Sequence, residues 1–171
     1  MKPLITILSL LLSTTAARAV EPFEAVEKAI LSLAKADPRN PVIRDAEWRQ
    51  ELTAGLLETS KNHGLDPLLL SVVTFCESSF EPGVVGKIGE KGLGQVIPMI
   101  QRQHACNMDS PYGELECAAR HLAWCYKQCH SDYGALTLYA TGKRCTSEEG
   151  SLTDRKIKFR LHLYAKLKAL R

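Results

Sequence analysis

One apolar stretch decides the fold, and residues 66–82 read Asp66-Pro67-Leu68-Leu69-Leu70-Ser71-Val72-Val73-Thr74-Phe75-Cys76-Glu77-Ser78-Ser79-Phe80-Glu81-Pro82. An aspartate followed by proline is typical of a helix N-cap with proline at the first helical position. The apolar run behind it predicts a helix from Leu68 to about Cys76. Such a helix carries Glu77 at its C-terminal end, and the Gly- and Pro-rich residues 78–95 predict an irregular segment.

Apolar residues recur at helical spacing on both sides of this stretch. Upstream, they predict helices over 22–36 and 46–62, with a loop over 37–41 between them and a stop at His63-Gly64. Downstream, they predict a short helix after Gln95, a long one over 112–130, one from near Ala135 beyond the separator Gly134, and one over 153–171. No pair of strands is indicated, so we expect one all-α domain.

The N-terminus has the pattern of a secretory signal peptide. Met1-Lys2 is followed by an apolar run over 4–12 and by Ala17-Arg18-Ala19, a small-x-small cleavage site. We therefore expect residues 1–19 to be a signal peptide and residues 20–171 to form the mature domain, in the periplasm or secreted. A retained anchor is the alternative, but the apolar run is shorter than the ~20 residues that span a bilayer.

All six cysteines lie in the mature chain, where an exported protein keeps disulfides. Six cysteines allow 15 pairings, and a bridge between Cys125 and Cys129 is disfavoured because their side chains project in parallel from one helix. A bridge at Cys76 would brace the helix that carries Glu77, with a buried free thiol as the alternative. Zinc at Cys125-x-x-x-Cys129-His130 is a competing interpretation, although paired CxxC spacing is missing.

Charge is unevenly distributed along the chain. The 171 residues hold 22 Lys and Arg against 19 Asp and Glu, and this net +3 is too small to favour nucleic acid. Residues 151–171 hold seven basic side chains and one acidic, a net +6, which leaves −5 on residues 20–150. A basic amphipathic helix can bind an anionic membrane surface or polymer, but a packed terminal helix with a solvated basic face is the interpretation we favour.

Glu77 is the candidate catalytic group. A carboxyl group at a helix C-terminus meets the negative end of the helix dipole, and apolar neighbours such as Phe75 and Phe80 surround it in the sequence. Both effects disfavour the ionised form, and a carboxyl group that keeps its proton can act as a general acid. A solvated surface glutamate is the alternative. The glycine-rich segment over 86–95 lets the backbone approach a ligand closely.

Three ordered motifs resemble those of the soluble-type lytic transglycosylases, which share a lysozyme-like fold with goose-type lysozymes. Glu77-Ser78-Ser79-Phe80-Glu81-Pro82 resembles the catalytic Glu-Ser motif, and Gly64-Leu65-Asp66-Pro67-Leu68-Leu69 resembles its lead-in. Gly89-Glu90-Lys91-Gly92-Leu93-Gly94-Gln95 is similar to the Gly-x-x-Gly-Leu-Met-Gln loop, and residues 135–142 are similar to Ala-Leu-x-x-Tyr-Asn-x-Gly. The resemblance covers about residues 50–145. Gly94 and Ala140 replace the family's methionine and asparagine.

The resemblance implies a lytic transglycosylase that cleaves peptidoglycan between N-acetylmuramic acid and N-acetylglucosamine and leaves a 1,6-anhydro end. By it, Glu77 is the acid/base, Ser78 hydrogen-bonds near Glu77, Gln95 contacts sugar, and Tyr139 lies across the cleft. It implies no metal or cofactor and peptidoglycan strands as partner. We expect a monomer, and a secretion or conjugation machine is a further candidate partner.

Three rival functions remain open. A hydrolytic muramidase on the same fold would use a second carboxylate to activate water, with Glu90, Asp109 and Asp132 as candidates. A non-catalytic wall-binding or accessory protein of a secretion or conjugation system would keep the fold without the reaction. A membrane-active protein would act through the helix at 153–171.

Overall fold

The computed structural model of the protein describes residues 22–170, and within this range it contains helices and no strand. The helices are α1 (Pro22–Ala34), α2 (Pro41–Arg44), α3 (Ala46–His63), α4 (Pro67–Ser78), α5 (Pro98–Gln103), α6 (Pro111–Cys129), α7 (Asp132–Thr141) and α8 (Leu152–Lys168). The prediction of an all-α fold is confirmed. The expected signal peptide at 1–19 lies outside the described residues.

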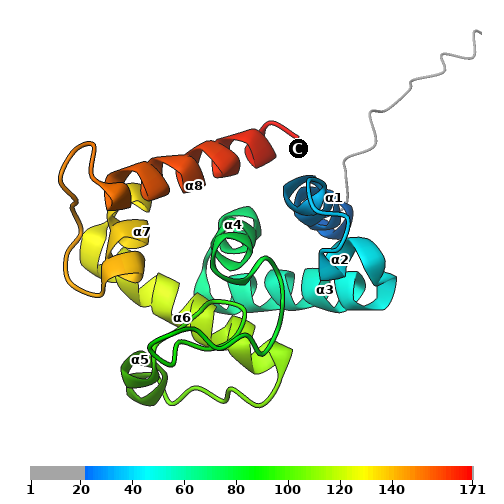
Figure 1. Cartoon of the computed structure of the whole chain (residues 1–171), viewed down its shortest axis with the longest axis horizontal. Coiled ribbons are helices and arrows are strands. Elements are labelled where there is room, and N and C mark those ends of the chain that lie inside the picture. Colours follow the sequence, from blue (N-terminus) through cyan, green and yellow to red (C-terminus); the bar gives the residue numbers. More distant parts are fainter. Residues whose placement is uncertain (1–21, 171) are drawn as a thin grey trace, which may run out of the picture.

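Helix α4 lies in the middle of the molecule and is surrounded by the others (Figure 1). It begins as the sequence predicted, because the Asp66 side chain accepts from Leu68 N at 2.9 Å and Pro67 follows the cap. Helices α1, α3, α6 and α8 all pack against it. Its apolar side chains are therefore buried on nearly every side, for example Leu70, Val72 and Val73 at 0% exposed. This central position fixes where the end of α4 delivers Glu77.

Two local features differ from the expectation. Residues 41–44 form α2, which begins at the last residue of the loop predicted over 37–41, because Asn40 caps this turn by accepting from Val42 N at 3.1 Å. Helix α7 begins at Asp132 rather than near Ala135, and Gly134 lies inside it. The Ser131 hydroxyl accepts from Gly134 N at 3.1 Å, and a Cβ on Gly134 would lie 2.8 Å from Cys129 Cβ. This glycine permits close packing and is no separator.

Two disulfides join parts of the fold, Cys106–Cys117 and Cys129–Cys145. Cys76 and Cys125 are free thiols, so the expected brace at Cys76 is wrong. Burial raises the pKa of the Cys76 thiol. In residues 22–170, no three His, Cys, Asp or Glu side chains gather in a way that would hold a metal ion.

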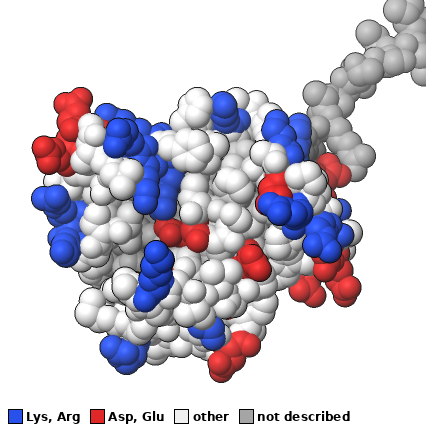
Figure 2. All heavy atoms as spheres, viewed as in Figure 1, with Lys and Arg blue, Asp and Glu red and all other residues white. Residues whose placement is uncertain are grey.

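The C-terminal helix α8 packs on α4 and α7 with Ile157 and Leu167 buried. Basic side chains gather near its N-terminal half in Figure 2, and acidic side chains lie toward the middle of the same face. Among the described residues, no helix combines the length and apolar character needed to cross a bilayer. The C-terminal helix is thus a packed element with a largely exposed basic face.

Candidate active site

Glu77 lies on the last turn of α4 and makes an ion pair with α8. Its Oε1 accepts from Arg160 Nη2 at 2.7 Å. The glutamate side chain is 20% exposed and the arginine side chain 8%, so the pair is largely withdrawn from water. The sequence did not indicate this contact, because Arg160 reads as one more residue of a basic face. The carboxyl group at the end of α4 therefore has a cation beside it, which the sequence prediction did not include.

Ser78 connects α4 to the loop over 79–97, which contains the glycine-rich segment and is called the glycine-rich loop below. Its Oγ lies 3.1 Å from Thr74 O and 3.0 Å from Leu93 O, in hydrogen-bond range of both carbonyls. The loop therefore starts and returns at the same turn of α4. Both partners of the Ser78 hydroxyl are backbone carbonyls, so its position supports a tether between helix and loop beside Glu77.

The start of this loop is fixed by contacts with α2, α3 and α4. Ser79 and Phe80 both have positive φ, 55° and 66°. Asn40 Nδ2 donates to Ser79 O at 2.8 Å, and Trp48 Nε1 donates to Phe80 O at 3.2 Å. The Phe80 ring is 0% exposed and lies 5.5 Å from the Phe75 ring. These contacts hold a backbone shape that side-chain-bearing residues rarely adopt.

Glu114 of α6 holds the middle of the loop, and the sequence analysis missed it. This glutamate is 3% exposed, and its carboxylate accepts from Gly83 N at 3.1 Å and from Leu93 N at 3.0 Å. A Cβ on Gly92 would lie 2.4 Å from the Glu114 carboxyl carbon. The glycine therefore allows the loop backbone to close around a buried acceptor. The signal available in the sequence was an acidic residue in the first turn of a predicted helix, which is common in helices without such a role.

Gln95 and Tyr139 lie on one pocket of about 160 Å³, together with His121, Ala140 and Gly142. Gln95 Nε2 donates to Val84 O at 2.9 Å and to Gly92 O at 3.0 Å, so its amide is held by the loop itself. Glu77 does not line this pocket. The structure thus brings two of the expected sugar contacts together in one pocket.

Tyr139 connects that pocket to the glutamate. Its hydroxyl donates to Gly94 O at 2.8 Å. Burial, followed by the negative charge of Glu77, raises the pKa of Tyr139 well above its ordinary value. The phenol and the carboxylate therefore lie within electrostatic reach of each other.

Gly94 is a close-packed position. A Cβ there would lie 2.4 Å from Ala118 Cβ and 2.7 Å from the Tyr139 hydroxyl. No side chain fits unless α6 or Tyr139 moves. The missing methionine of the related motif thus leaves no empty space, because Ala118 and Tyr139 occupy it.

A cluster of aromatic and imidazole rings packs beside Tyr139. His121 is 4% exposed, and its ring lies 4.9 Å from that of Tyr139 and 5.8 Å from that of Trp124. Burial, helped by the field of His104, lowers the pKa of His121 from 6.5 to about 4. A neutral imidazole therefore lines the pocket beside Tyr139.

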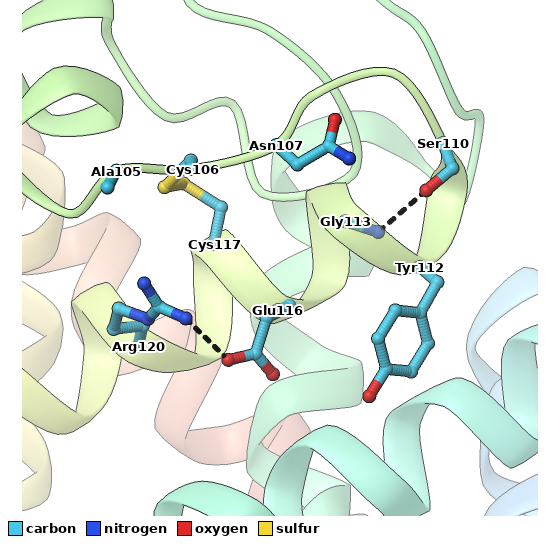
Figure 3. A pocket seen from close by; sticks show the side chains of 9 residues that line it. All are labelled: Ala105, Cys106, Asn107, Ser110, Tyr112, Gly113, Glu116, Cys117 and Arg120. Carbon is cyan, nitrogen blue, oxygen red and sulfur yellow. Dashed lines mark hydrogen bonds and ion pairs between the residues drawn. A yellow bond between two sulfur atoms is a disulfide. The ribbon is translucent and has the colours of Figure 1, made fainter.

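A separate pocket of about 250 Å³ lies where the Cys106–Cys117 disulfide meets the start of α6 (Figure 3). Its charged side chains pair through one oxygen of Glu116, since Oε1 accepts from Arg120 Nη2 at 3.0 Å and lies 2.6 Å from His63 Nε2. The other oxygen, Oε2, is buried and has no hydrogen-bond partner. Burial raises the pKa of Glu116, but these two partners outweigh it and lower the pKa. None of the residues expected from the sequence to act on substrate lines this pocket.

Comparison with known proteins bears on the fold and the family. No curated protein matches the chain. Among solved structures, the X-ray structure of an inactive mutant of the lytic transglycosylase Slt from Pseudomonas aeruginosa matches with a TM-score of 0.57 and 18% identity, which shows likeness of fold alone. The match covers 85% of this chain and 27% of that one, so the chain spans about a quarter of that protein's length.

The family comparison covers the whole candidate site. Residues 56–161 match the family described as the Transglycosylase SLT domain. This span contains Glu77, the glycine-rich loop, Tyr139 and Arg160. The chain belongs to the Transglycosylase SLT domain family.

Proposed function

We propose that the protein is a peptidoglycan lytic transglycosylase with Glu77 as its general acid and base. The observation that carries this proposal is the position of Glu77 at the end of the central helix, partly exposed, beside a pocket that Gln95 and Tyr139 line. The structural neighbour is described as inactive, and the mutation in its description replaces a glutamate by glutamine. That statement concerns the neighbour, and it supports Glu77 by analogy.

In the proposed reaction, protonated Glu77 gives its proton to the glycosidic oxygen while the bond from that oxygen to the muramic C1 breaks. The neighbouring N-acetyl group stabilises the developing cation in place of a second carboxylate. The C6 hydroxyl of the same sugar then bonds to C1, and ionised Glu77 takes the hydroxyl proton. The product is a 1,6-anhydro end, and Glu77 regains its starting form without consuming water.

The other site residues have supporting roles in this proposal. Gln95 and Tyr139 bind sugar in the pocket that they share, and Ala140 beside them takes the place of the family's asparagine. Ser78 keeps the loop against α4 through Leu93 O at 3.0 Å. Substrate contact is thus concentrated on the loop and α7, while α4 supplies the reacting carboxyl group.

Hydrolysis by a muramidase is the second candidate, since the same fold and acid would serve it. It needs a second carboxylate to activate water. Glu90 Oε2 accepts from Ile88 N at 2.9 Å within its own loop, and Asp132 Oδ1 accepts from the Tyr126 hydroxyl at 2.5 Å. Two of the three candidate carboxylates are thus engaged locally, Asp109 being the third, and the mass of the product separates the two reactions.

The deciding experiment is mass spectrometry of purified peptidoglycan digested by the mature protein. We expect fragments lighter by one water than reducing-end fragments. Reducing ends alone would establish hydrolysis instead. No cleavage by the folded wild-type protein would favour a wall-binding or accessory role.

Glu77→Gln should abolish release of fragments while the circular dichroism spectrum stays unchanged. The matched control is Glu81→Gln, the same substitution at an exposed position four residues along the chain. Cleavage by Glu77→Gln at the wild-type rate would exclude this glutamate as the acid.

The compartment and partners are part of the proposal. Action on peptidoglycan places the protein outside the cytoplasm, in the periplasm or secreted, and two disulfides fit an oxidising compartment. A monomeric state and a secretion or conjugation machine as partner stay predictions. Size-exclusion chromatography with light scattering tests the first, and co-purification from the native host tests the second.

A further inference from the structure

Arg160 is a buried cation that the proposed reaction does not use. Within the described part of α8, it is the only basic side chain that is buried, while Arg155, Lys156, Lys166 and Lys168 are exposed. Its Nη1 is also buried and has no hydrogen-bond partner. A guanidinium is costly to withdraw from water, and a buried ion pair is weak evidence for stability, because apolar residues of similar size stabilise as well. This cost suggests a role for Arg160 other than stability.

The position of Arg160 is fixed from both ends of its helix. Asp154 near the start of α8 accepts from the Tyr133 hydroxyl of α7 at 2.7 Å, and the buried Ile157 and Leu167 anchor the helix on the core. Arg160 follows Ile157 by three residues and therefore lies on the same, inward face. The guanidinium reaches Glu77 from an element that is itself held in place.

The contact restrains the glutamate in two ways. The Nη2–Oε1 distance of 2.7 Å is that of a strong charge-assisted hydrogen bond, so it selects one orientation of the carboxylate. The positive charge also stabilises the ionised form, and Arg160 itself does not lose its proton in a protein. Both effects act on the one group whose protonation the proposed reaction requires.

We propose that Arg160 is a positioning residue that orients the Glu77 carboxylate and stabilises the ionised form that accepts the C6 hydroxyl proton. The effect of Arg160 on cleavage rests on the proposed function, whereas the interaction between its charge and Glu77 does not. Arg160 favours the ionised form that accepts the C6 hydroxyl proton and opposes the protonated form that starts the reaction. The proton itself moves only between Glu77 and substrate.

The following groups on α4 and on the helices around it are neutral or have partners of their own. Tyr139 faces it from α7, and Cys76 is its neighbour on α4; burial raises the pKa of both, which keeps them neutral at physiological pH. On α6, the Glu114 carboxylate is engaged by Gly83 N and Leu93 N. On α1 and α3, Glu27 and Arg49 pair with each other at 2.9 Å.

The test is a carboxyl-carbon NMR titration of protein labelled with 13C-glutamate, with the Glu77 signal assigned by its loss in Glu77→Gln. Arg160→Gln should move the Glu77 midpoint to higher pH by about one unit or more. Arg155→Gln removes the same charge from an exposed site on the same helix and should leave the midpoint unchanged. An unmoved midpoint in folded Arg160→Gln would overturn the proposal. This measurement needs no activity, so it is independent of the proposed function.

The pH dependence of peptidoglycan cleavage gives the second readout. The cleavage rate falls as pH rises through the titration of the acid, and we call this part of the pH–rate profile its alkaline limb. In Arg160→Gln the alkaline limb should move to higher pH by the same amount as the NMR midpoint. Arg160→Lys keeps a cation and should return the limb toward that of the wild type. A limb that stays in place while the midpoint moves would refute the catalytic part alone.

Arg160→Gln leaves a partly buried carboxylate without its partner, and this alone can prevent folding. In that case the double variant Glu77→Gln, Arg160→Gln decides, because it removes both charges. Recovery of the folded state in the double variant is expected. If the double variant is as unfolded as the single one, Arg160 acts through packing and the proposal is wrong.

Discussion

Replacing Glu114 tests whether one buried carboxylate holds the glycine-rich loop in place. In Glu114→Ala, the amides of Gly83 and Leu93 lose their acceptor, which they meet at 3.1 and 3.0 Å. Leu93 is buried and Gly83 is exposed, so only the Leu93 amide is left buried without a partner. Such an N–H costs about 1–3 kcal/mol, and we expect a loss of that size in the free energy of unfolding. The whole stability of an ordinary domain is about 5–15 kcal/mol.

The assay is urea unfolding followed by tryptophan fluorescence. Trp48 is a suitable reporter because its indole N–H donates to Phe80 O at the start of the loop. Limited trypsin digestion supplies a local readout, since Lys87 lies in this loop and is exposed. We expect faster cleavage there in Glu114→Ala, because the loop opens before the rest of the chain.

Two further variants sharpen the result. Glu114→Gln keeps the volume and one acceptor oxygen, so its loss should be smaller than that of the alanine variant. Gln128→Ala, at an exposed position of the same helix, should change stability by less than about 0.5 kcal/mol. If Glu114→Ala costs less than about 1 kcal/mol and trypsin sensitivity is unchanged, the carboxylate does not hold the loop and this reasoning fails.

Two other predictions follow from close packing and from a buried imidazole. Gly94→Ala should cost about 1–3 kcal/mol, because the new methyl lies 2.4 Å from Ala118 Cβ; an unfolding midpoint equal to that of the wild type would contradict it. The pKa of His121 is lowered from 6.5 to about 4, so between these values the unfolded chain binds more protons and stability falls as pH drops. His121→Gln should remove up to about 3 kcal/mol of this dependence. Urea unfolding at pH 7 and pH 4.5 measures the change in the free energy of unfolding between the two pH values. The same change in the variant and in the wild type would contradict the prediction.

The helices were predictable because each carries a local signal. The Asp66-Pro67 cap and the apolar run behind it placed α4 correctly, and the stripe of α1 placed that helix within two residues at its end. The errors occurred where a local signal was ambiguous. Gly134 is typical of a helix end, yet it lies inside α7. A glycine is needed there because any larger residue would place its Cβ too close to Cys129.

The candidate site was predictable only where it lies on one segment of chain. Glu77 and the loop followed from neighbouring residues and from the motifs. Arg160 is 83 residues away from Glu77 in sequence and has the same local pattern as the exposed cations around it. Glu114 is likewise 21 residues from Leu93, its amide partner. Contacts of this kind arise from tertiary packing, and helical periodicity carries no information about them. Disulfide pairing among six cysteines has the same origin.

The two free thiols constrain how the chain acquires its disulfides. Cys125 is four residues before Cys129 in the sequence, so in an unfolded chain either of these two cysteines can form a disulfide with Cys145. In the folded protein Cys125 is 0% exposed, and burial raises the pKa of its thiol to about 12, which leaves almost no thiolate for exchange. If Cys125 pairs with Cys145 first, the folded pairing is reached when the Cys129 thiolate attacks that bridge, while the sulfurs are still accessible. The core protects its thiol only after it has formed.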